Sequence, residues 1–259
     1  MARFHTRNVS RENLEDFVRL CVPADRADES SFKRGISLKA DWVERMLAEK
    51  GCIGKLAYDG TKPVGMIQYL PCPDENVVKI ACIFVPSDKH LRKGIGSALL
   101  KSLIDDVTTP VSCFRNMTVK ALVTNAFDVP GTYTQHEFYR KKGFSATAED
   151  PHLLCYPLRD GVTYTPPKER YTRRSEDREK ALIFFDGTCP FSIRFVEKMV
   201  QLIREVSPSI PIQTINKLNQ PEEVEKRGGR VPDCIVNQRP IRSGFFDAEN
   251  FKREVREAL

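Results

Sequence analysis

The chain has 259 residues, of which 41% are hydrophobic and 29% are charged, and it carries a formal net charge of +6. This length allows two domains, and the composition is ordinary for a globular protein. No part is strongly basic, so we expect no nucleic-acid partner. No apolar run approaches the roughly 18 residues that span a bilayer. Because no apolar signal region follows Met1–His5, we expect a cytoplasmic protein without membrane partners.

The predicted elements of the first 158 residues alternate between helix and strand. In chain order they are a helix after Ser10, a helix from Ser37 to Gly51, strands over 52–58, 64–70 and 77–85, a helix over 94–107, a strand over 117–123, a short helix over 135–142 and a hairpin over 144–156. The strand over 77–85 is nearly continuously apolar, which predicts burial on both faces.

A polar stretch with Pro166-Pro167 and no apolar periodicity follows Leu158. The elements predicted after it are a strand over 181–185, a helix opened by Cys189, a strand over 212–215, a short helix over 222–227, strands over 234–236 and 241–242, and a last helix capped by Asp247. We therefore predict an α/β protein with domains over 1–158 and 180–259, joined by a linker over 159–179.

The eight cysteines form no Cys-x-x-Cys pair, and Cys82, Cys155 and Cys234 lie in strand-like apolar runs. A free cysteine in such a run acts as a small hydrophobe. The chain has neither the short length nor the secreted character of disulfide scaffolds, so we expect none. The chain has only four histidines and no closely spaced pair of metal-ligating residues, so we expect no metal site.

The segment from Val85 to Leu100 joins the buried strand to an amphipathic helix through a basic loop. The first turn of a helix offers unpaired N–H groups and a partial positive charge, so it can bind a pyrophosphate. Gly94 and Gly96 would let the backbone approach the phosphates, and Arg92 and Lys93 add positive charge. Taken alone, this pattern also fits a tight turn with basic side chains.

Together with the segment His136–Phe144, which contains Phe138-Tyr139 and Gly143-Phe144, this loop resembles the conserved motifs of the GCN5-related N-acetyltransferases (GNAT). The resemblance covers about residues 1–158. It implies a mixed β-sheet flanked by helices, acetyl-CoA as cosubstrate, and direct acetyl transfer to a primary amine of a small molecule or peptide. Leu91 departs from the family, which usually has Arg or Gln there, and Phe127–Thr134 lengthens the connection after Asn125.

The cofactor-binding residues that the resemblance implies are Ile83, Phe84, Val85, Leu91, Arg92, Lys93, Gly94, Ile95, Gly96, Ser97, Asn125 and Tyr139. The edge of the Ile83–Val85 strand would bind the pantetheine arm, and a backbone N–H there would polarise the thioester carbonyl. Tyr139 would protonate the departing thiolate, or it would only pack against Phe144. The general base is not evident. Glu75 is a candidate that would act through water, or it is a solvated surface acid.

The loops expected to build the acceptor pocket are Cys21–Ile36 and Phe127–Thr134, because acceptor sites in this fold are built from variable loops. The sequence identifies neither the acceptor amine nor the oligomeric state.

Residues 180–259 resemble the thioredoxin and glutaredoxin pattern, and also the YoaP-like C-terminal domain of some acetyltransferases. Cys189 would lie at a helix N-terminus, where a thiol pKa is lowered. The pattern has a Val-Pro peptide, here Val231-Pro232 and usually cis, facing that cysteine. Cys189 and Pro232 are therefore a possible thiol site in a small thioredoxin-like α/β domain. Ser192 replaces the second cysteine, which excludes two-thiol exchange within the motif.

Three hypotheses about function remain open at this point. The first is the N-acetyltransferase, with a structural or substrate-shaping role for the second domain. The second is a monothiol redox module in which the first domain only senses acyl-CoA. The third is a noncatalytic acyl-CoA-binding protein.

Overall fold

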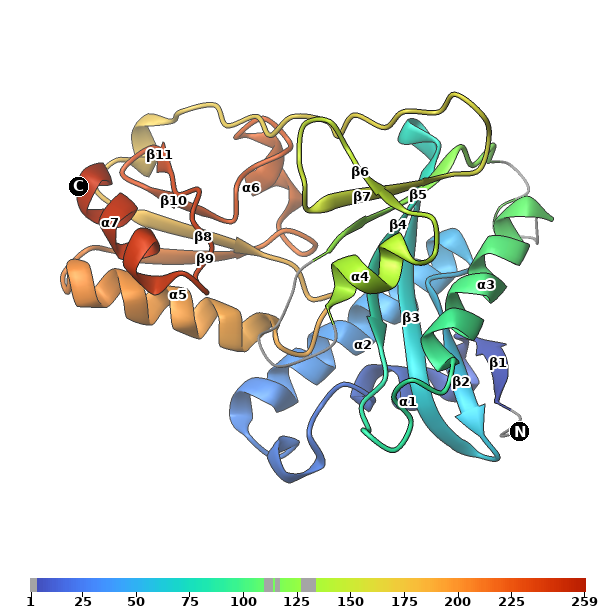
Figure 1. Ribbon diagram of the computed structural model, residues 1–259. Helices are drawn as coiled ribbons and strands as arrows, with labels where there is room; N and C mark the ends of the chain where they lie inside the picture. Colours follow the sequence, from blue (N-terminus) through green and yellow to red (C-terminus); the bar gives the residue numbers. More distant parts are fainter. Residues whose placement is uncertain (1–3, 110–113, 115–116, 127–133) are drawn as a thin grey trace. The chain divides into compact units, whose positions relative to one another are not determined.

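The computed structural model describes residues 4–109, 114, 117–126 and 134–259 (Figure 1). Contacts between Cα atoms divide the chain into two compact units. The first unit is Met1–Cys21 with Val43–Pro166, and the second is Val22–Trp42 with Pro167–Leu259. Helix α2 (Ser30–Lys50) therefore contributes residues 30–42 to the second unit and 43–50 to the first. No sequence pattern predicted that residues 22–42 would join the later unit.

The predicted α/β class is confirmed, because a large mixed sheet flanked by helices occurs together with a second sheet of four strands. The first sheet has seven strands in the order β1-β2-β3-β4-β5-β7-β6. These strands are β1 (His5–Asn8), β2 (Gly54–Asp59), β3 (Lys62–Cys72), β4 (Val77–Phe84), β5 (Ala121–Asn125), β6 (Ser145–Ala146) and β7 (Leu153–Pro157). Strands β4 and β5 are parallel, and the other neighbours are antiparallel.

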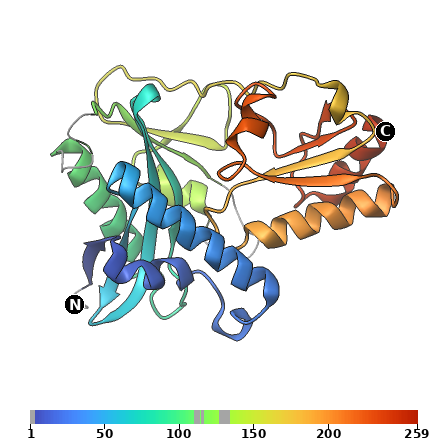
Figure 2. The same cartoon turned by 180° about the vertical axis from the view of Figure 1, so that it is seen from behind.

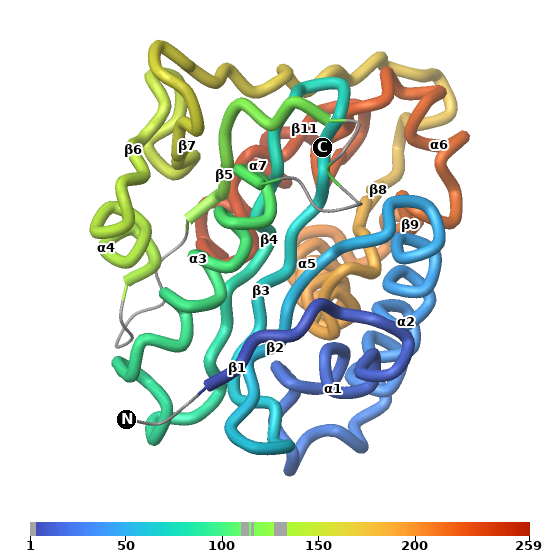
Figure 3. Tube along the Cα trace, turned by 90° about the vertical axis from the view of Figure 1, so that its right-hand side faces the viewer, coloured from blue at the N-terminus to red at the C-terminus, as the bar shows by residue number. Residues whose placement is uncertain are grey.

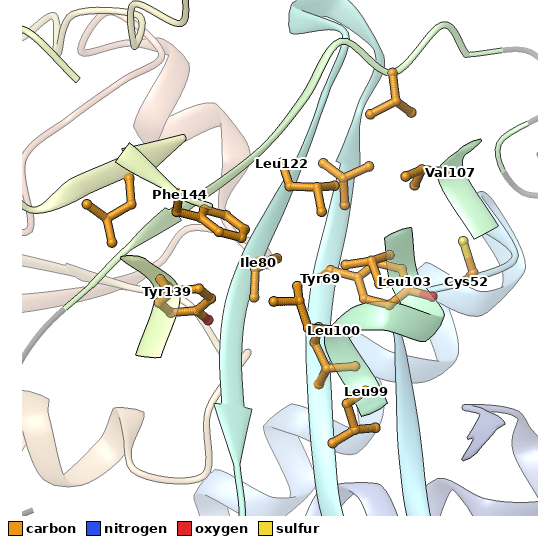
Figure 4. Packing of buried hydrophobic residues seen from close by; sticks show 14 of the residues in the cluster. Cys52, Tyr69, Ile80, Leu99, Leu100, Leu103, Val107, Leu122, Tyr139 and Phe144 are labelled. Atoms are coloured by element: carbon orange, nitrogen blue, oxygen red, sulfur yellow. The ribbon is translucent and has the colours of Figure 1, made fainter. Parts of the chain in front are cut away.

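Helices cover both faces of this sheet. Helix α3 (Ile95–Thr108) lies on the face seen in Figure 1, and α1 (Leu14–Arg19) lies on the opposite face, seen in Figure 2. The apolar side of α3, with Leu99, Leu100 and Leu103, packs with Ile80 of β4 and Leu122 of β5 (Figure 4). Burying each such side chain contributes roughly 1.5–3 kcal/mol, so this cluster holds α3 firmly on the sheet.

Helix α4 (Gln135–Arg140) follows β5 and lies together with β6 and β7 (Figures 1 and 3). Thr134 begins this helix by accepting a hydrogen bond from the Glu137 N–H at 3.2 Å, as an N-cap residue does. The short 3₁₀ helix η3 (Pro73–Glu75) connects β3 to β4. The predicted acceptor loop Phe127–Thr134 falls, up to residue 133, outside the described residues.

The second unit contains a four-stranded sheet in the order β11-β10-β8-β9. Strands β8 (Ala181–Phe185) and β9 (Ile212–Asn216) are parallel, and β10 (Cys234–Val236) is antiparallel to both β8 and β11 (Arg239–Pro240). Its later helices are α5 (Ser192–Val206), α6 (Pro221–Glu225) and α7 (Ala248–Ala258). The buried faces of α5 and α7 share one apolar core with the sheet.

The predicted linker contributes structure to both units. In the first unit, the Tyr164 hydroxyl donates a hydrogen bond of 2.6 Å to Glu75. In the second, Asp177 is fully buried and accepts hydrogen bonds from Tyr171 and from the Arg227 guanidinium. The domain boundaries predicted from the sequence remain a prediction. The polar composition of residues 159–179 did not indicate the contacts that Tyr164, Tyr171 and Asp177 make.

Four local expectations are corrected. Helix α2 begins at Ser30 rather than Ser37, because Gly35 lies within the helix instead of ending it. Helix α5 begins at Ser192 rather than Cys189, because the Asp186 carboxylate holds the preceding turn by accepting from the Thr188 N–H and hydroxyl. No cis peptide bond occurs among the described residues, so the Val231–Pro232 peptide is trans. Cys52 takes part in a disulfide, whereas the sequence led us to expect free thiols.

The described ranges also bear on membrane spans and metal sites. None of their helices combines the length and apolarity that a membrane span requires. In the same ranges, no group of three or more His, Cys, Asp or Glu side chains could hold a metal ion.

Candidate functional site

Strands β4 and β5 diverge in the middle of the first sheet. They pair from Val77–Ala121 to Ile80–Thr124, and β5 ends at Asn125. Strand β4 continues to Phe84 and remains paired with β3 on its other edge. Beyond Ile80, the edge of β4 that faced β5 is therefore no longer covered by that strand. Such an edge can pair with an extended, amide-containing ligand.

A β-bulge marks the start of this divergence. Gln68 of β3 pairs with Cys82, but the next residue, Tyr69, pairs with Ile80, so Ala81 is an extra residue in β4. A bulge bends its strand and increases the local twist, and bulges are over-represented beside active sites. The irregularity at Ala81 thus gives a physical reason for β4 to leave β5 at this point.

The loop after β4 ends at the open N-terminus of α3. Gly94 is the N-cap residue, with φ +84°, and no side chain caps the helix. The first helical hydrogen bond runs from the Ala98 N–H to the Gly94 carbonyl at 2.9 Å. The N–H groups of Ile95, Gly96 and Ser97 therefore have no earlier helical carbonyl as acceptor. Together with the positive end of the helix dipole, these N–H groups make a turn that can bind an anion.

The basic loop keeps its charged side chains in solvent. Arg92 and Lys93 are exposed, and Arg92 adopts a left-handed conformation with φ +59°. A non-glycine residue in that region is uncommon, and such strain often occurs at ligand sites. Leu91, at the position where the family usually has Arg or Gln, is 44% exposed, so its side chain adds neither charge nor core packing.

Gly96 brings three elements of the site together. A Cβ atom added there would lie 3.4 Å from the Phe138 ring of α4 and 3.5 Å from Ile83 Cγ2 of β4. The first turn of α3, helix α4 and the uncovered part of β4 therefore meet at Gly96. The structure thus brings together Val85–Leu100 and His136–Phe144, the two segments whose resemblance to the family implies that they bind one cofactor.

Tyr139 lies in the core of this region and is only 2% exposed. Its ring packs against Phe144, with 5.0 Å between the ring centroids (Figure 4). Its hydroxyl is hydrogen-bonded to the Thr124 side chain. Burial is the main cause that raises the pKa of Tyr139 well above its usual value, and nearby Cys82 adds to the effect. The phenol is consequently neutral and keeps a proton at the point where β4 and β5 part.

The structure does not bring every predicted residue to this point. Asn125 lies at the end of β5 with an exposed side chain and pairs with Leu153 of β7. Glu75 precedes β4 and accepts the hydrogen bond from Tyr164. The five residue steps from Val77 to Cys82 span about 16 Å of strand, so Glu75 and the Tyr139 hydroxyl lie at different levels of the sheet.

Sequence reasoning missed several residues near Tyr139. Thr124 and Cys82 adjoin its hydroxyl because of strand register, which no local pattern reveals. The rings of His136 and His152 lie 5.2 Å apart in an edge-to-face arrangement, one in α4 and one just before β7. No local sequence pattern predicts this contact between α4 and the residue before β7.

The possible thiol site lies at the carboxyl end of β8. Cys189 is half-buried in the turn before α5, and its carbonyl accepts a hydrogen bond of 3.0 Å from the Ser192 N–H. Pro232 is buried just before β10, beside β8, because the Phe184 N–H donates to the Asp233 carbonyl at 2.8 Å. Cys234 is buried too, and this burial raises the pKa of its thiol.

The family model described as "Acetyltransferase (GNAT) family" matches residues 14–144, about half of the chain. The protein therefore belongs to the GNAT family of acetyltransferases. No curated protein sequence matches it.

Several solved structures are similar to this chain. PaiA N-acetyltransferase from Thermoplasma acidophilum, solved with coenzyme A, is 14% identical, with 59% of this chain and 96% of that chain covered and a TM-score of 0.44. A GNAT acetyltransferase from Brucella melitensis, solved with acetyl-CoA, is 14% identical over 65% and 95%, with a TM-score of 0.44. A GNAT acetyltransferase from Staphylococcus aureus Mu50 is 17% identical over 61% and 100%, with a TM-score of 0.46.

Proposed function

We propose that this protein transfers the acetyl group of acetyl-CoA directly to a primary amine of a small molecule or peptide. The observation that carries the proposal is the divergence of β4 from β5 beyond Ile80, with the uncapped first turn of α3 next to it. A phosphate-binding turn and an uncovered strand edge, meeting at Gly96, suit a ligand that has a diphosphate and an amide-containing arm.

In this proposal, the N–H groups of Ile95, Gly96 and Ser97 bind the diphosphate, and Arg92 and Lys93 supply positive charge. The backbone of Ile83–Val85 pairs with the pantetheine arm, and one of its N–H groups polarises the thioester carbonyl. Leu91 contributes only through its backbone. We assign Asn125 no contact with the cofactor, because it lies exposed at the end of β5 and pairs with Leu153 of β7.

The amine nitrogen attacks the thioester carbon, so that an N–C bond forms and the C–S bond breaks. Tyr139 donates its phenolic proton to the departing thiolate, the ammonium proton passes to water, and the phenolate regains a proton from water. Because burial keeps the phenol protonated, it can act as the acid at neutral pH. We give Glu75 no direct role, since it lies at the start of β4. Holding amine and thioester together can itself contribute roughly 7–11 kcal/mol.

We further propose that residues 180–259 form a thioredoxin-like domain with a structural role. The parallel pair β8–β9 joined through α5, followed by the antiparallel strands β10 and β11 and by α7, supports this fold. The position of Cys189 in the turn before α5, rather than in its first helical turn, argues against an activated thiol centre. The monothiol redox module stays the alternative.

The test has two stages. Calorimetry of the full-length protein with acetyl-CoA and with CoA measures cofactor binding, and mass spectrometry of acetylated products across an amine panel measures transfer. Product detection avoids thiol reagents, which would react with the chain's own cysteines. Absence of binding to both CoA forms would refute the proposal, and binding without transfer to any amine would favour a noncatalytic acyl-CoA-binding protein.

Tyr139→Phe tests the acid. We expect turnover to fall about 10²–10⁴-fold, with an unchanged Kd for acetyl-CoA, because general acid catalysis has that magnitude. Tyr156→Phe is the matched control, since Tyr156 also packs on Phe144, at 5.2 Å between ring centroids. If both variants keep turnover within about twofold of the wild type, Tyr139 serves only in packing.

A further inference from the structure

Two histidine rings meet beside the carboxyl end of β5, within the first unit. His136 is half-buried in the first turn of α4, and its ring lies 5.2 Å from the ring of His152. His152 continues the pairing of β7 with β5, because its carbonyl accepts a hydrogen bond of 2.8 Å from the Ala126 N–H. Ala126 belongs to the same buried cluster as Tyr139, so the pair lies on the face of the sheet that carries Tyr139.

The register of the sheet places this pair close to the proposed reaction centre. The Tyr139 hydroxyl is bonded to Thr124, which pairs with Leu154 of β7. His152 lies two residues from Leu154, a distance of about 7 Å along a strand. On α4, His136 precedes Tyr139 by three residues, and side chains with this spacing are neighbours on one helix face. A proton acceptor at this range can act through one water molecule.

The turn before β7 holds the outer histidine in place. The Asp150 carboxylate accepts a hydrogen bond of 2.8 Å from the His152 N–H. The Asp150 carbonyl accepts from the Thr147 hydroxyl at 3.1 Å and from the Leu153 N–H at 3.2 Å. His152 is exposed, whereas His136 is half-buried. The pair therefore connects the surroundings of Tyr139 with solvent.

The charged side chains around the pair leave the role of proton acceptor to the histidines. Among the described residues, α4 carries Glu137 and Arg140, the turn carries Asp150, and β5 carries none. Glu137 follows His136 directly, so the two do not share a helix face, and it pairs with Lys141. Histidine changes its charge between about pH 5 and 8, which suits a base that works at neutral pH.

We infer that His136 and His152 together are the general base of the acetyl transfer, an inference that rests on the proposed function. Once the amine nitrogen has bonded to the acetyl carbon, its proton passes through one water molecule to the pair. Tyr139 meanwhile gives its proton to the thiolate as the C–S bond breaks. His152 then releases the accepted proton to solvent, and the phenolate regains one from water, so every group ends the cycle as it began.

His136→Gln and His152→Gln in the full-length protein test the inference, with His5→Gln as the control. His5 is also in ring contact, stacked 5.6 Å from Tyr58, but it lies in β1 at the opposite edge of the same sheet. Mass spectrometry of the product gives kcat/KM for the best amine of the panel between about pH 5 and 9. The wild-type value is divided by the variant value at each pH, because ionisation of the amine then cancels.

We expect this ratio to lie near one at about pH 5, where protonated histidine accepts no proton, and to rise to about 10²–10⁴ above about pH 8. Added imidazole should restore part of the rate lost in His152→Gln. The Kd of acetyl-CoA should stay at the wild-type value in each variant, and the ratio for His5→Gln should stay near one throughout. If His136→Gln does not fold, the exposed His152→Gln carries the test.

A ratio that is the same at every pH would overturn the inference, because a structural loss does not follow the charge of histidine. Wild-type rates in both variants would overturn it too. In either case the wild type would still acetylate the amine, and the proposed function would stand. If the wild type neither binds acetyl-CoA nor acetylates any amine, the proposed function and the general base fall together.

Discussion

Replacing Arg227 by methionine should strongly destabilise the second unit. The Arg227 side chain is 2% exposed, and its guanidinium donates to the two Asp177 oxygens at 2.9 and 2.6 Å. It also donates to Glu223 at 2.8 Å, while Tyr171 donates to Asp177 at 2.9 Å. These hydrogen bonds are the main cause that raises the pKa of Arg227, so the side chain is fully ionised in the folded protein.

The expected magnitude follows from what remains after the substitution. Asp177 is fully buried, and without Arg227 its carboxylate would keep only the Tyr171 hydroxyl among these partners. Removing one partner of a buried ion pair typically costs about 3–5 kcal/mol, because the other charge is left uncompensated. Whole domains are stable by about 5–15 kcal/mol, so the variant should lose a large fraction of its stability.

Urea unfolding followed by tryptophan fluorescence measures this loss. Trp42 is the single tryptophan of the chain, is 1% exposed and belongs to the second unit, so its signal reports that unit. Arg253→Met is the control, since the Arg253–Glu257 pair is also short, at 2.7 Å, but its side chains are 55% and 59% exposed. An exposed pair contributes about 0–1 kcal/mol.

Replacing both Arg227 and Asp177 with apolar residues should recover much of the loss, since paired replacement of buried charges is often close to neutral. If Arg227→Met and Arg253→Met were equally stable, the reasoning about the buried pair would be refuted.

Three further predictions concern the active site and the thiol. Gly94→Ala should cost about 1–2 kcal/mol of stability, because Gly94 has a left-handed φ of +84°, although a Cβ there would meet no atom within 4 Å. The same substitution should weaken acetyl-CoA binding in calorimetry, and wild-type affinity would contradict the role of this turn. Burial raises the pKa of both Tyr69 and Tyr139 in the folded protein. Above about pH 10 these tyrosines ionise only in the unfolded chain, which favours unfolding. The stability that they contribute should therefore be complete below about pH 10 and decline as the pH rises further. Tyr139→Phe should reduce that alkaline decline in urea titrations, and an unaltered slope would argue against a buried neutral phenol. Cys189→Ser should leave acetyl transfer unchanged, and loss of function would favour the redox alternative.

The sequence alone determined the local parts of the site. Apolar continuity over residues 77–85, the basic loop and the periodic apolar positions after Gly94 predicted the strand, turn and helix that became β4 and α3. Each of these features depends only on residues within one strand or about four turns of helix, and over such short segments residue propensity and apolar periodicity determine the secondary structure. No residue range was predicted for β1, because His5–Asn8 is polar and mostly exposed and carries no such periodicity.

Only the tertiary structure decided how these pieces meet. The loss of pairing beyond Ile80 depends on register with a strand about forty residues later in the chain. The hydrogen bond of Tyr139 with Thr124, the docking of Gly35 on Pro190 and the burial of Asp177 by Arg227 likewise join distant segments. Local composition sets which elements form, but such long-range contacts depend on shape and charge complementarity between elements, which appears only once the chain has folded.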